Sequence, residues 1–488
     1  MTIKRSTLLL CLVVSLNLYA QEFKVSFSPS VWNQPFSGGV VVYLSKENKQ
    51  PKDQNAGLDI FPCFSIFVKN VRPGETVILN DKVKSYPDPI SEIERSDYYA
   101  QVVWDRNSGG RAISASPGNL YSKTIRIHID KDFKKIFEML ADQVIPEPQF
   151  VQTKYVKELK APSTLLSRFH NKPMTVDAAV VLPKEYFDDS LRKFPVLFVV
   201  FGYGGDYHAF SNSQYPSQLM DSIPVINVFL DGNCSLGHSV YANSDNNGPW
   251  GDALTTEFIP MLEKEFRCNG ARLITGHSSG GWTVVWLQTH YSKIFDACWS
   301  SSPDPVDFRN FQKINLYKDR NAYYDADSSL RQVGTVAGRF PWISTKTICS
   351  MENVIYRGEQ MHSFNAVFSR MGKDGWPEKI CNEQTGVIDS LVFDHWKNYD
   401  ISFFLRNHWD SLKASLDGKI RISVGRQDNF LLNYSVAQLE EEMKKLHADF
   451  TVAYYPGDHF TVFTPEYRSD GTKFLAQKYR AWLNKNSK

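Results

Sequence analysis

The chain has 488 residues, of which 42% are hydrophobic and 22% charged, and its net charge is +2. This length favours two or three domains, and the composition is that of an ordinary globular protein. Because the net charge is close to neutral, neither a nucleic-acid partner nor an acidic tail is expected.

The first twenty residues have the pattern of a secretory signal peptide. Lys4 and Arg5 precede an apolar run over residues 8–16, and Ala20 supplies a small residue for cleavage. The run is too short to cross a membrane, and no later segment has about 18 unbroken apolar residues. We therefore predict a signal peptide at 1–20, a secreted or periplasmic location and no membrane span.

Cysteine spacing gives no sign of a metal site. Cys11 lies in the predicted signal peptide, and none of the six later cysteines forms a Cys-x-x-Cys pair. An even number in an exported chain permits disulfides, but the spacing does not tell which cysteines would pair. A zinc ribbon or redox motif is not indicated, and neither a metal nor a cofactor is expected.

Residues 21–135 are predicted to form an Ig-like β-sandwich domain. Short β-branched or aromatic runs are separated by turn signals such as Pro73 followed by Gly74. Between residues 125 and 129, isoleucines alternate with polar residues, as in a half-buried strand. Because the aromatic residues fit core strands, we favour a bracing role for this domain over glycan binding.

Residues 136–172 are rich in proline and predict a linker, and residues 173–488 predict an α/β domain. In the latter, segments of helical spacing alternate with continuous apolar runs, which are typical of parallel strands covered on both faces. These runs cover residues 195–201, 224–230, 272–275 and 419–424.

One long segment interrupts this alternation. Residues 305–410 are rich in aromatic residues and histidine but have few strand patterns. Insertions over strand ends commonly form lids or substrate walls, so we expect a cap-like insertion here.

Gly276, Ser278 and Gly280 fit the G-x-S-x-G pattern of a serine nucleophile, with a strand pattern before them and a helix-compatible stretch after them. A tight strand-to-helix turn would raise the serine hydroxyl into the open, and side chains at the glycine positions would collide with neighbouring elements. The pattern occurs by accident in roughly one such chain in ten, so other residues must indicate whether Ser278 is a nucleophile.

A serine nucleophile needs a histidine base that a carboxylate orients. Asp428 follows the strand pattern at 419–424, and His459 follows the next strand pattern. The order serine, acid, histidine on loops after successive strands is that of α/β-hydrolases, so Ser278, Asp428 and His459 are the predicted catalytic residues. Asp304, after the strand that follows Ser278, is an alternative acid, whereas Asp458 is interpreted as a loop residue.

Two backbone amides are predicted to bind the substrate oxyanion. The glycine-rich stretch 201–210 follows the first long buried strand, where this fold places one N–H donor, and we choose Tyr203 with Gly204 as the alternative. The N–H of Ser279, at the start of the helix, is the predicted partner.

The remaining histidines of interest are interpreted without catalytic roles. His277 is expected to point away from the reaction centre and to pack. His362, His395 and His408 lie in the insertion, where hydrogen-bonded surface positions are favoured over a place in the pocket.

Several motifs in order resemble the Putative esterase family, which includes enterochelin esterases, feruloyl and acetylxylan esterases and mycolyltransferases. The resemblance begins at residues 163–186, continues through "FPVLFVVFGYGGDYHAF", "NGPWGDALTTEFIPMLEKEF" and "GHSSGGW", and ends with "VGRQDNFLL" and "PGDHF". It implies an α/β-hydrolase fold, metal-independent serine hydrolysis and a triad of Ser278, Asp428 and His459. The long insertion and the N-terminal domain depart from the short family members and leave the substrate undefined.

The favoured interpretation is an exported serine esterase acting on a small-molecule or glycan-linked ester, such as a carbohydrate- or siderophore-linked one. An acyltransferase or a serine peptidase with the same triad are alternatives, since sequence does not separate them. A non-catalytic carbohydrate-binding protein is a third, and the ordered Ser, Asp and His argue against it. The oligomeric state is not predicted.

Overall fold

The computed structural model describes residues 21–130 and 135–486, so the predicted signal peptide lies outside the described residues. The chain divides into two compact units. The first comprises the described residues up to Lys52 together with 61–104 and 121–143, and the second comprises 53–60, 105–120 and everything from Val144 onward. None of the described helices combines the length and the apolar character that a membrane crossing requires.

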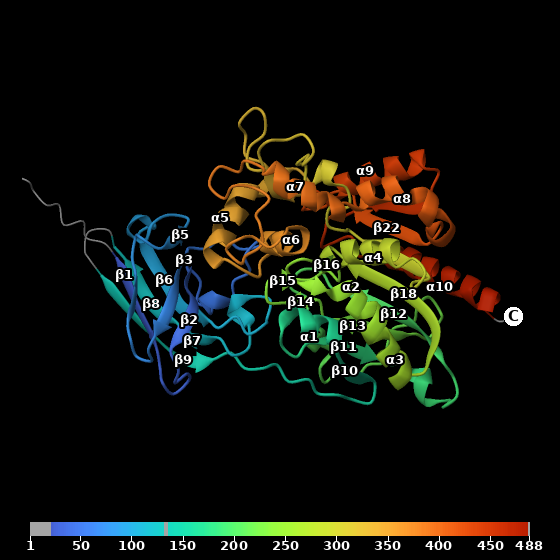
Figure 1. Cartoon of the computed structure of the whole chain (residues 1–488), viewed down its shortest axis with the longest axis horizontal. Helices are drawn as coiled ribbons and strands as arrows, with labels where there is room; N and C mark the ends of the chain where they lie inside the picture. Colours follow the sequence, from blue (N-terminus) through green and yellow to red (C-terminus); the bar gives the residue numbers. More distant parts are fainter. Residues whose placement is uncertain (1–20, 131–134, 487–488) are drawn as a thin grey trace, which may run out of the picture. The chain divides into compact units, whose positions relative to one another are not determined.

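The first unit is β-rich, which confirms that part of the prediction (Figure 1). Its strands follow the order β4-β1-β9-β7-β6-β2-β3-β5, with β8 also paired to β6, and the Ig-like sandwich arrangement stays a prediction. Rings of Phe27, Phe36 and Trp104 pack edge-on or tilted in its core. The strands are β1 (Glu22–Phe27), β2 (Phe36–Ser45), β3 (Cys63–Val71), β4 (Val77–Leu79), β5 (Lys84–Tyr86), β6 (Ser96–Asp105), β7 (Leu120–Ser122), β8 (Ile125–Ile129) and β9 (Ile136–Val144).

The second unit is built on a sheet with the order β10-β11-β13-β12-β18-β19-β22-β23. β11 pairs antiparallel with β10 and β13, and the pairs from β13 through β12 to β23 are parallel. These strands are β10 (Val156–Pro162), β11 (Thr175–Val181), β12 (Phe194–Val200), β13 (Ile226–Leu230), β18 (Cys268–His277), β19 (Ala297–Ser301), β22 (Ile420–Gly425) and β23 (Phe450–Tyr455).

Helices cover both faces of this sheet, which explains the continuous apolar runs in its strands. In β12, Val196 and Phe198 belong to the large core that includes Val284 of α4, whereas the intervening Leu197 packs in a second core with Leu475 of α10. Figure 1 shows α8 and α9 beside β22. The helices are α1 (Thr164–His170), α2 (Trp250–Ala253), a π-helical segment (Leu254–Phe258), α3 (Ile259–Glu265), α4 (Ser279–His290), α5 (Thr345–Ile355), α6 (Gln360–Phe368), α7 (Ser390–Trp396), α8 (Ile401–Leu416), α9 (Leu432–Lys445) and α10 (Pro465–Asn486).

Short elements complete the chain. Three hairpins pair β14 with β15, β16 with β17 and β20 with β21 within the described residues. Their bounds are β14 (Asn233–Cys234), β15 (Gly237–His238), β16 (Asn243–Ser244), β17 (Gly248–Pro249), β20 (Gln332–Val336) and β21 (Phe340–Ser344). Single 3-10 turns cover Pro51–Asp53, Ile90–Glu92, Ile113–Ala115, Lys184–Phe187, Tyr207–Phe210, Phe308–Asn310 and Lys397–Tyr399.

Residues 136–172 differ from the predicted linker, because they contain β9, β10 and α1. Val156, Leu159 and Ala161 of β10 are buried against the second sheet. Pro162 ends β10, an edge strand in which a missing N–H is tolerated. Pro162 therefore marks a strand end, whereas Pro146 and Pro148 lie in the irregular stretch between β9 and β10.

Two segments also lie outside the unit to which the sequence assigns them. Residues 53–60 and 105–120 fall within the predicted N-terminal domain, yet they belong to the second compact unit. Neither segment forms an extended strand of its own, and local periodicity does not indicate on which core a connecting segment packs.

Candidate active site

Ser278 lies on the turn between β18 and α4. Its backbone has φ 59° and ψ −123°, a strained combination for a residue with a side chain. A Cβ on Gly276 would lie 2.3 Å from the Gly280 carbonyl oxygen, and one on Gly280 would lie 2.1 Å from that of Val200. Glycine is therefore required at both positions, and the turn presents the Ser278 side chain to a cavity.

Backbone hydrogen bonds fix this turn to the neighbouring strand. The Ser278 N–H donates to the Ser301 carbonyl at 2.9 Å, and the Ser278 carbonyl accepts the N–H of Asp304 at 3.1 Å. Within the described part of the chain, the Ser279 N–H has no hydrogen-bond partner. It is the first amide of α4, so it lies where a helix N-terminus favours negative charge.

Asp428 and His459 are brought together by the neighbouring parallel strands β22 and β23. His459 Nδ1 lies 2.8 Å from Asp428 Oδ2, and the two side chains are 3% and 0% exposed. The second carboxylate oxygen of Asp428 accepts the Phe430 N–H at 2.9 Å. With Nδ1 engaged, Nε2 is the imidazole nitrogen left for a second partner, and His459 lines the same cavity as Ser278.

Asn429 is a structural contributor that the sequence reasoning missed. Its Oδ1 accepts the His459 N–H at 3.0 Å, and its Nδ2 donates to the Thr335 carbonyl at 3.0 Å. Asn429 thus fixes the histidine loop to β20 of the insertion. Its position beside Asp428 was the only sequence signal that could have found it.

Asp304, the alternative acid, lies beneath the serine turn rather than on the imidazole. Its Oδ2 accepts the Ser279 hydroxyl at 2.6 Å, and it lines the cavity. Burial raises the pKa of Asp304 to about 6, against the hydrogen bond from Ser279 and the charge of His459. Of the two carboxylates, Asp428 is the one hydrogen-bonded to His459.

His277 packs against the candidate base. Its ring centroid lies 4.5 Å from that of His459, and its Nδ1 lies 2.8 Å from Ser301 Oγ. Burial, and next the neighbouring His459, hold the pKa of His277 well below its usual range. A neutral ring there packs without adding charge, although it borders the cavity rather than pointing away.

The glycine-rich loop after β12 lies against the serine. A Cβ on Gly202 would be 3.0 Å from Ser278 Cβ and 3.7 Å from its Oγ. Tyr203 borders the cavity, and its N–H has no hydrogen-bond partner among the described residues. Gly204, with φ +82°, is in the left-handed region that favours glycine.

The cavity at this site has a volume of about 350 Å³. Most of its wall is apolar, and ten of its 21 lining residues come from segments in which no site residue was predicted. The insertion contributes Val333, Ile348, Met361 and Phe364, and the segment 53–60 contributes Asn55 to Leu58. Phe430, Phe460 and Phe463 follow the predicted acid and histidine closely, which was a signal for their part in the wall.

The insertion histidines lie away from this cavity. His362 borders a separate small cavity with Cys349 and Cys381, and His395 Nδ1 lies 2.8 Å from the Phe368 carbonyl oxygen. The described cysteines all have free thiols, and no group of three His, Cys, Asp or Glu side chains in the described segments is placed to hold a metal ion.

Several solved structures are similar to this chain. A ferulic acid esterase is 16% identical, with 67% of this chain and 98% of that chain covered and a TM-score of 0.38. FphF, a fluorophosphonate-binding serine hydrolase of Staphylococcus aureus, is 14% identical, with 66% and 98% covered and a TM-score of 0.39. An S-formylglutathione hydrolase from Agrobacterium tumefaciens is 14% identical, with 67% and 97% covered and a TM-score of 0.39. No curated protein matches the sequence.

The family comparison is decisive for the class of protein. The model of the family described as "Putative esterase" matches residues 167–477, which include the serine turn, both downstream loops and the insertion. This match spans more than half of the chain and confirms the resemblance found in the sequence. The chain therefore belongs to the Putative esterase family and is a carboxylic ester hydrolase with an α/β-hydrolase fold.

Proposed function

We propose that the protein is an exported serine esterase with Ser278, His459 and Asp428 as its catalytic triad. His459 Nε2 takes the proton of the Ser278 hydroxyl as Oγ attacks the ester carbonyl, and Asp428 holds the imidazole through Nδ1. The protonated imidazole then gives its proton to the departing alcohol, and water hydrolyses the acyl-enzyme by the same route.

One observation carries this proposal: the 2.8 Å contact between His459 and Asp428 borders the cavity into which the strained Ser278 turn opens. An imidazole needs such an orienting acceptor to serve as a base, and a nucleophile needs exposure to substrate. The free N–H groups of Tyr203 and Ser279 supply the two donors of an oxyanion hole on either side of Ser278.

The cavity wall favours an ester with an apolar portion, because aromatic and aliphatic side chains dominate it. The insertion is proposed to act as the cap that shapes this cavity, and the N-terminal β-region, as an Ig-like sandwich, to brace the hydrolase. Carbohydrate-linked and siderophore-linked esters are the candidate substrates, and export rests on the signal pattern of residues 1–20.

The test is hydrolysis of a short-chain p-nitrophenyl ester by the Ser278→Ala variant. We expect kcat to fall by at least about 10⁴-fold with an unchanged melting temperature, because the nucleophile is lost while the turn remains. Ser279→Ala is the matched control, since it removes a neighbouring hydroxyl but keeps the backbone N–H donor. Turnover by Ser278→Ala at the wild-type rate, or strong inhibition by a chelator, would contradict the proposal.

Product analysis with and without an alcohol acceptor distinguishes hydrolysis from acyl transfer. Free acid is the expected product in both cases. A new ester formed with the acceptor would show that the protein is an acyltransferase and not an esterase. Faster turnover of a matched amide than of the ester would indicate a peptidase.

A further inference from the structure

Within the loop that carries the Tyr203 N–H, one turn hydrogen bond spans Tyr203, from the Gly205 N–H to the Gly202 carbonyl at 3.1 Å. Gly202, Gly204 and Gly205 surround Tyr203, and glycine restrains the backbone least. An oxyanion donor is effective only when its direction is set before the reaction, because reorganising it costs part of the stabilisation. Contacts of the Tyr203 side chain can therefore add to this single turn bond in setting the direction of the Tyr203 N–H.

The Tyr203 side chain is held on two sides. Its hydroxyl donates to the Glu359 carboxylate, and the Arg111 guanidinium lies 4.4 Å from the centroid of its ring. Glu359 is only 7% exposed, and burial raises its pKa, whereas Arg111, Tyr203 and Arg357 act to lower it. Arg111 therefore has two favourable partners, the ring face and the buried carboxylate.

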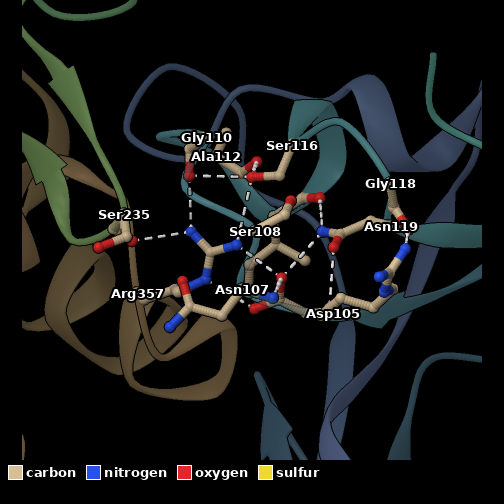
Figure 2. Close-up of polar contacts among 12 residues, drawn as sticks. Asp105, Asn107, Ser108, Gly110, Ala112, Ser116, Gly118, Asn119, Ser235 and Arg357 are labelled. Atoms are coloured by element: carbon tan, nitrogen blue, oxygen red, sulfur yellow. Dashed lines mark hydrogen bonds and ion pairs between the residues drawn. The ribbon is translucent and has the colours of Figure 1, made fainter. Parts of the chain in front are cut away.

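A buried ion pair connects the segment that contains Arg111 to the segment that contains Glu359, within the second unit. Arg357 donates from Nε and Nη2 to the two carboxylate oxygens of Asp105, each at 2.6 Å. Figure 2 shows the same guanidinium reaching the carbonyl oxygens of Gly110 and Ser235, each at 2.8 Å. The side chains of Arg357 and Asp105 are 0% and 1% exposed, so the pair is shielded from bulk solvent.

The two segments approach closely beside this pair. A Cβ on Gly358 would lie 1.9 Å from the Arg111 carbonyl oxygen, and Arg111 Nη1 donates to the Gly358 carbonyl at 3.4 Å. Gly358 has φ +83°, which suits glycine. The positions of Arg111 and Glu359 are consequently fixed relative to each other, with Tyr203 between them.

We propose that Arg111 and Glu359 are positioning residues that hold Tyr203 so that its backbone N–H points at the substrate oxyanion. The inference rests on the proposed serine esterase function. It assigns a part in the reaction to segment 105–120, which lies far upstream of the serine motif and outside the matched family region.

The experiment measures kcat and KM for a p-nitrophenyl ester, and the Ki of a trifluoromethyl ketone, in wild type, Arg111→Ala and Tyr203→Phe. The ketone forms a Ser278-linked oxyanion, so its affinity reports on the oxyanion hole, whereas a product carboxylate does not. We expect both variants to lose about 10- to 100-fold in kcat with KM nearly unchanged. The Ki of the ketone should rise by the same factor and that of the product should stay constant. Arg111→Lys keeps a cation over the ring and should restore most of the rate.

Arg106→Ala is the matched control, because Arg106 is an exposed arginine of the same segment that bonds the Gly118 carbonyl rather than Tyr203. Wild-type kcat and ketone affinity in both Arg111→Ala and Tyr203→Phe would overturn the inference while leaving the esterase proposal intact. Equal losses in Arg106→Ala, or losses that follow a lower melting temperature, would likewise overturn it. A wild-type protein that hydrolyses no ester would instead remove the proposed function itself. Tyr203→Phe deletes a single oxygen, so it gives a result even where Arg111→Ala does not fold.

Discussion

Two carboxylates lie near the candidate nucleophile, and their contacts give them different roles. Asp428 accepts from His459 Nδ1, whereas Asp304 accepts the Ser279 hydroxyl beneath the turn. Only the first contact selects the imidazole tautomer that can act as a base. The choice that the sequence left open therefore becomes a geometric distinction between two residues.

Matched amide substitutions test that distinction. Asp428→Asn should lower kcat by about 10⁴-fold, since the amide cannot support the required tautomer. Asp304→Asn preserves an oxygen acceptor for Ser279 and should cost less than about tenfold at pH 8. Steady-state kinetics of both variants on one ester provide the comparison. A larger loss of kcat in Asp304→Asn than in Asp428→Asn would show that Asp304, and not Asp428, orients the histidine.

The insertion contains a buried acid between two of its helices, α5 and α6. Glu352 of α5 is fully buried and accepts the N–H groups of Met361 and His362 at 3.1 and 2.9 Å, at the start of α6. Burial, and next the charge of Glu359, raise the pKa of Glu352 to about 8. The carboxyl group is therefore protonated in the folded protein at pH values where it ionises in the unfolded chain.

This shift predicts a pH-dependent stability. Because the folded pKa lies above the ordinary value of 4.5, the favourable contribution is present below pH 4.5 and is lost as the pH rises towards 8. Relative to Glu352→Gln, which does not titrate, wild type should lose about 3 kcal/mol of unfolding free energy between pH 5 and pH 8. Urea denaturation of both proteins at the two pH values measures the difference, and parallel pH dependences would show that Glu352 ionises normally in the fold.

The elements that carry the candidate triad could be predicted from sequence because their signals are local. A buried strand, a glycine-flanked serine and two strand-end loops each have a pattern within about ten residues. The glycine-rich loop that is proposed to carry one oxyanion donor was predicted from a local pattern as well. Asn429 and the part of the cavity wall that segment 53–60 forms were not predicted, because hydrogen bonds and packing between distant segments leave no periodic signal.

The two compact units of the molecule are interleaved along the sequence. Segments 53–60 and 105–120 belong to the second unit, although sheet strands of the first precede and follow them. Local patterns assigned both segments to the N-terminal domain, since strand periodicity on either side identifies only the sheet. The contacts that join 105–120 to the rest of the second unit are distant in sequence, and one of them, between Asp105 and Arg357, spans 252 positions.

That contact should be energetically large. The hydrogen bonds and charge of Arg357 outweigh burial and hold the pKa of Asp105 below its usual value. Arg357→Met leaves a buried carboxylate without its cation and should cost about 3–5 kcal/mol of unfolding free energy. Asp105→Asn should cost a similar amount. The loss in the double variant should be much smaller than the sum of the two single losses.

The exposed pair Arg480–Asp221, at 3.0 Å, is the control for this double-mutant cycle of Asp105 and Arg357. Its removal should cost less than about 1 kcal/mol. Chemical denaturation of the two sets of variants gives both coupling energies. Equal coupling in the buried and the exposed pair would contradict the structural role assigned to Asp105 and Arg357.

Covalent labelling shows whether Ser278 is an activated nucleophile. Wild type is treated with a fluorophosphonate at neutral pH and analysed by intact mass and peptide mapping. We expect one adduct per chain, located on Ser278, with none in Ser278→Ala and much slower labelling in His459→Ala. Labelling of another residue, or an equal adduct in Ser278→Ala, would contradict this role of Ser278.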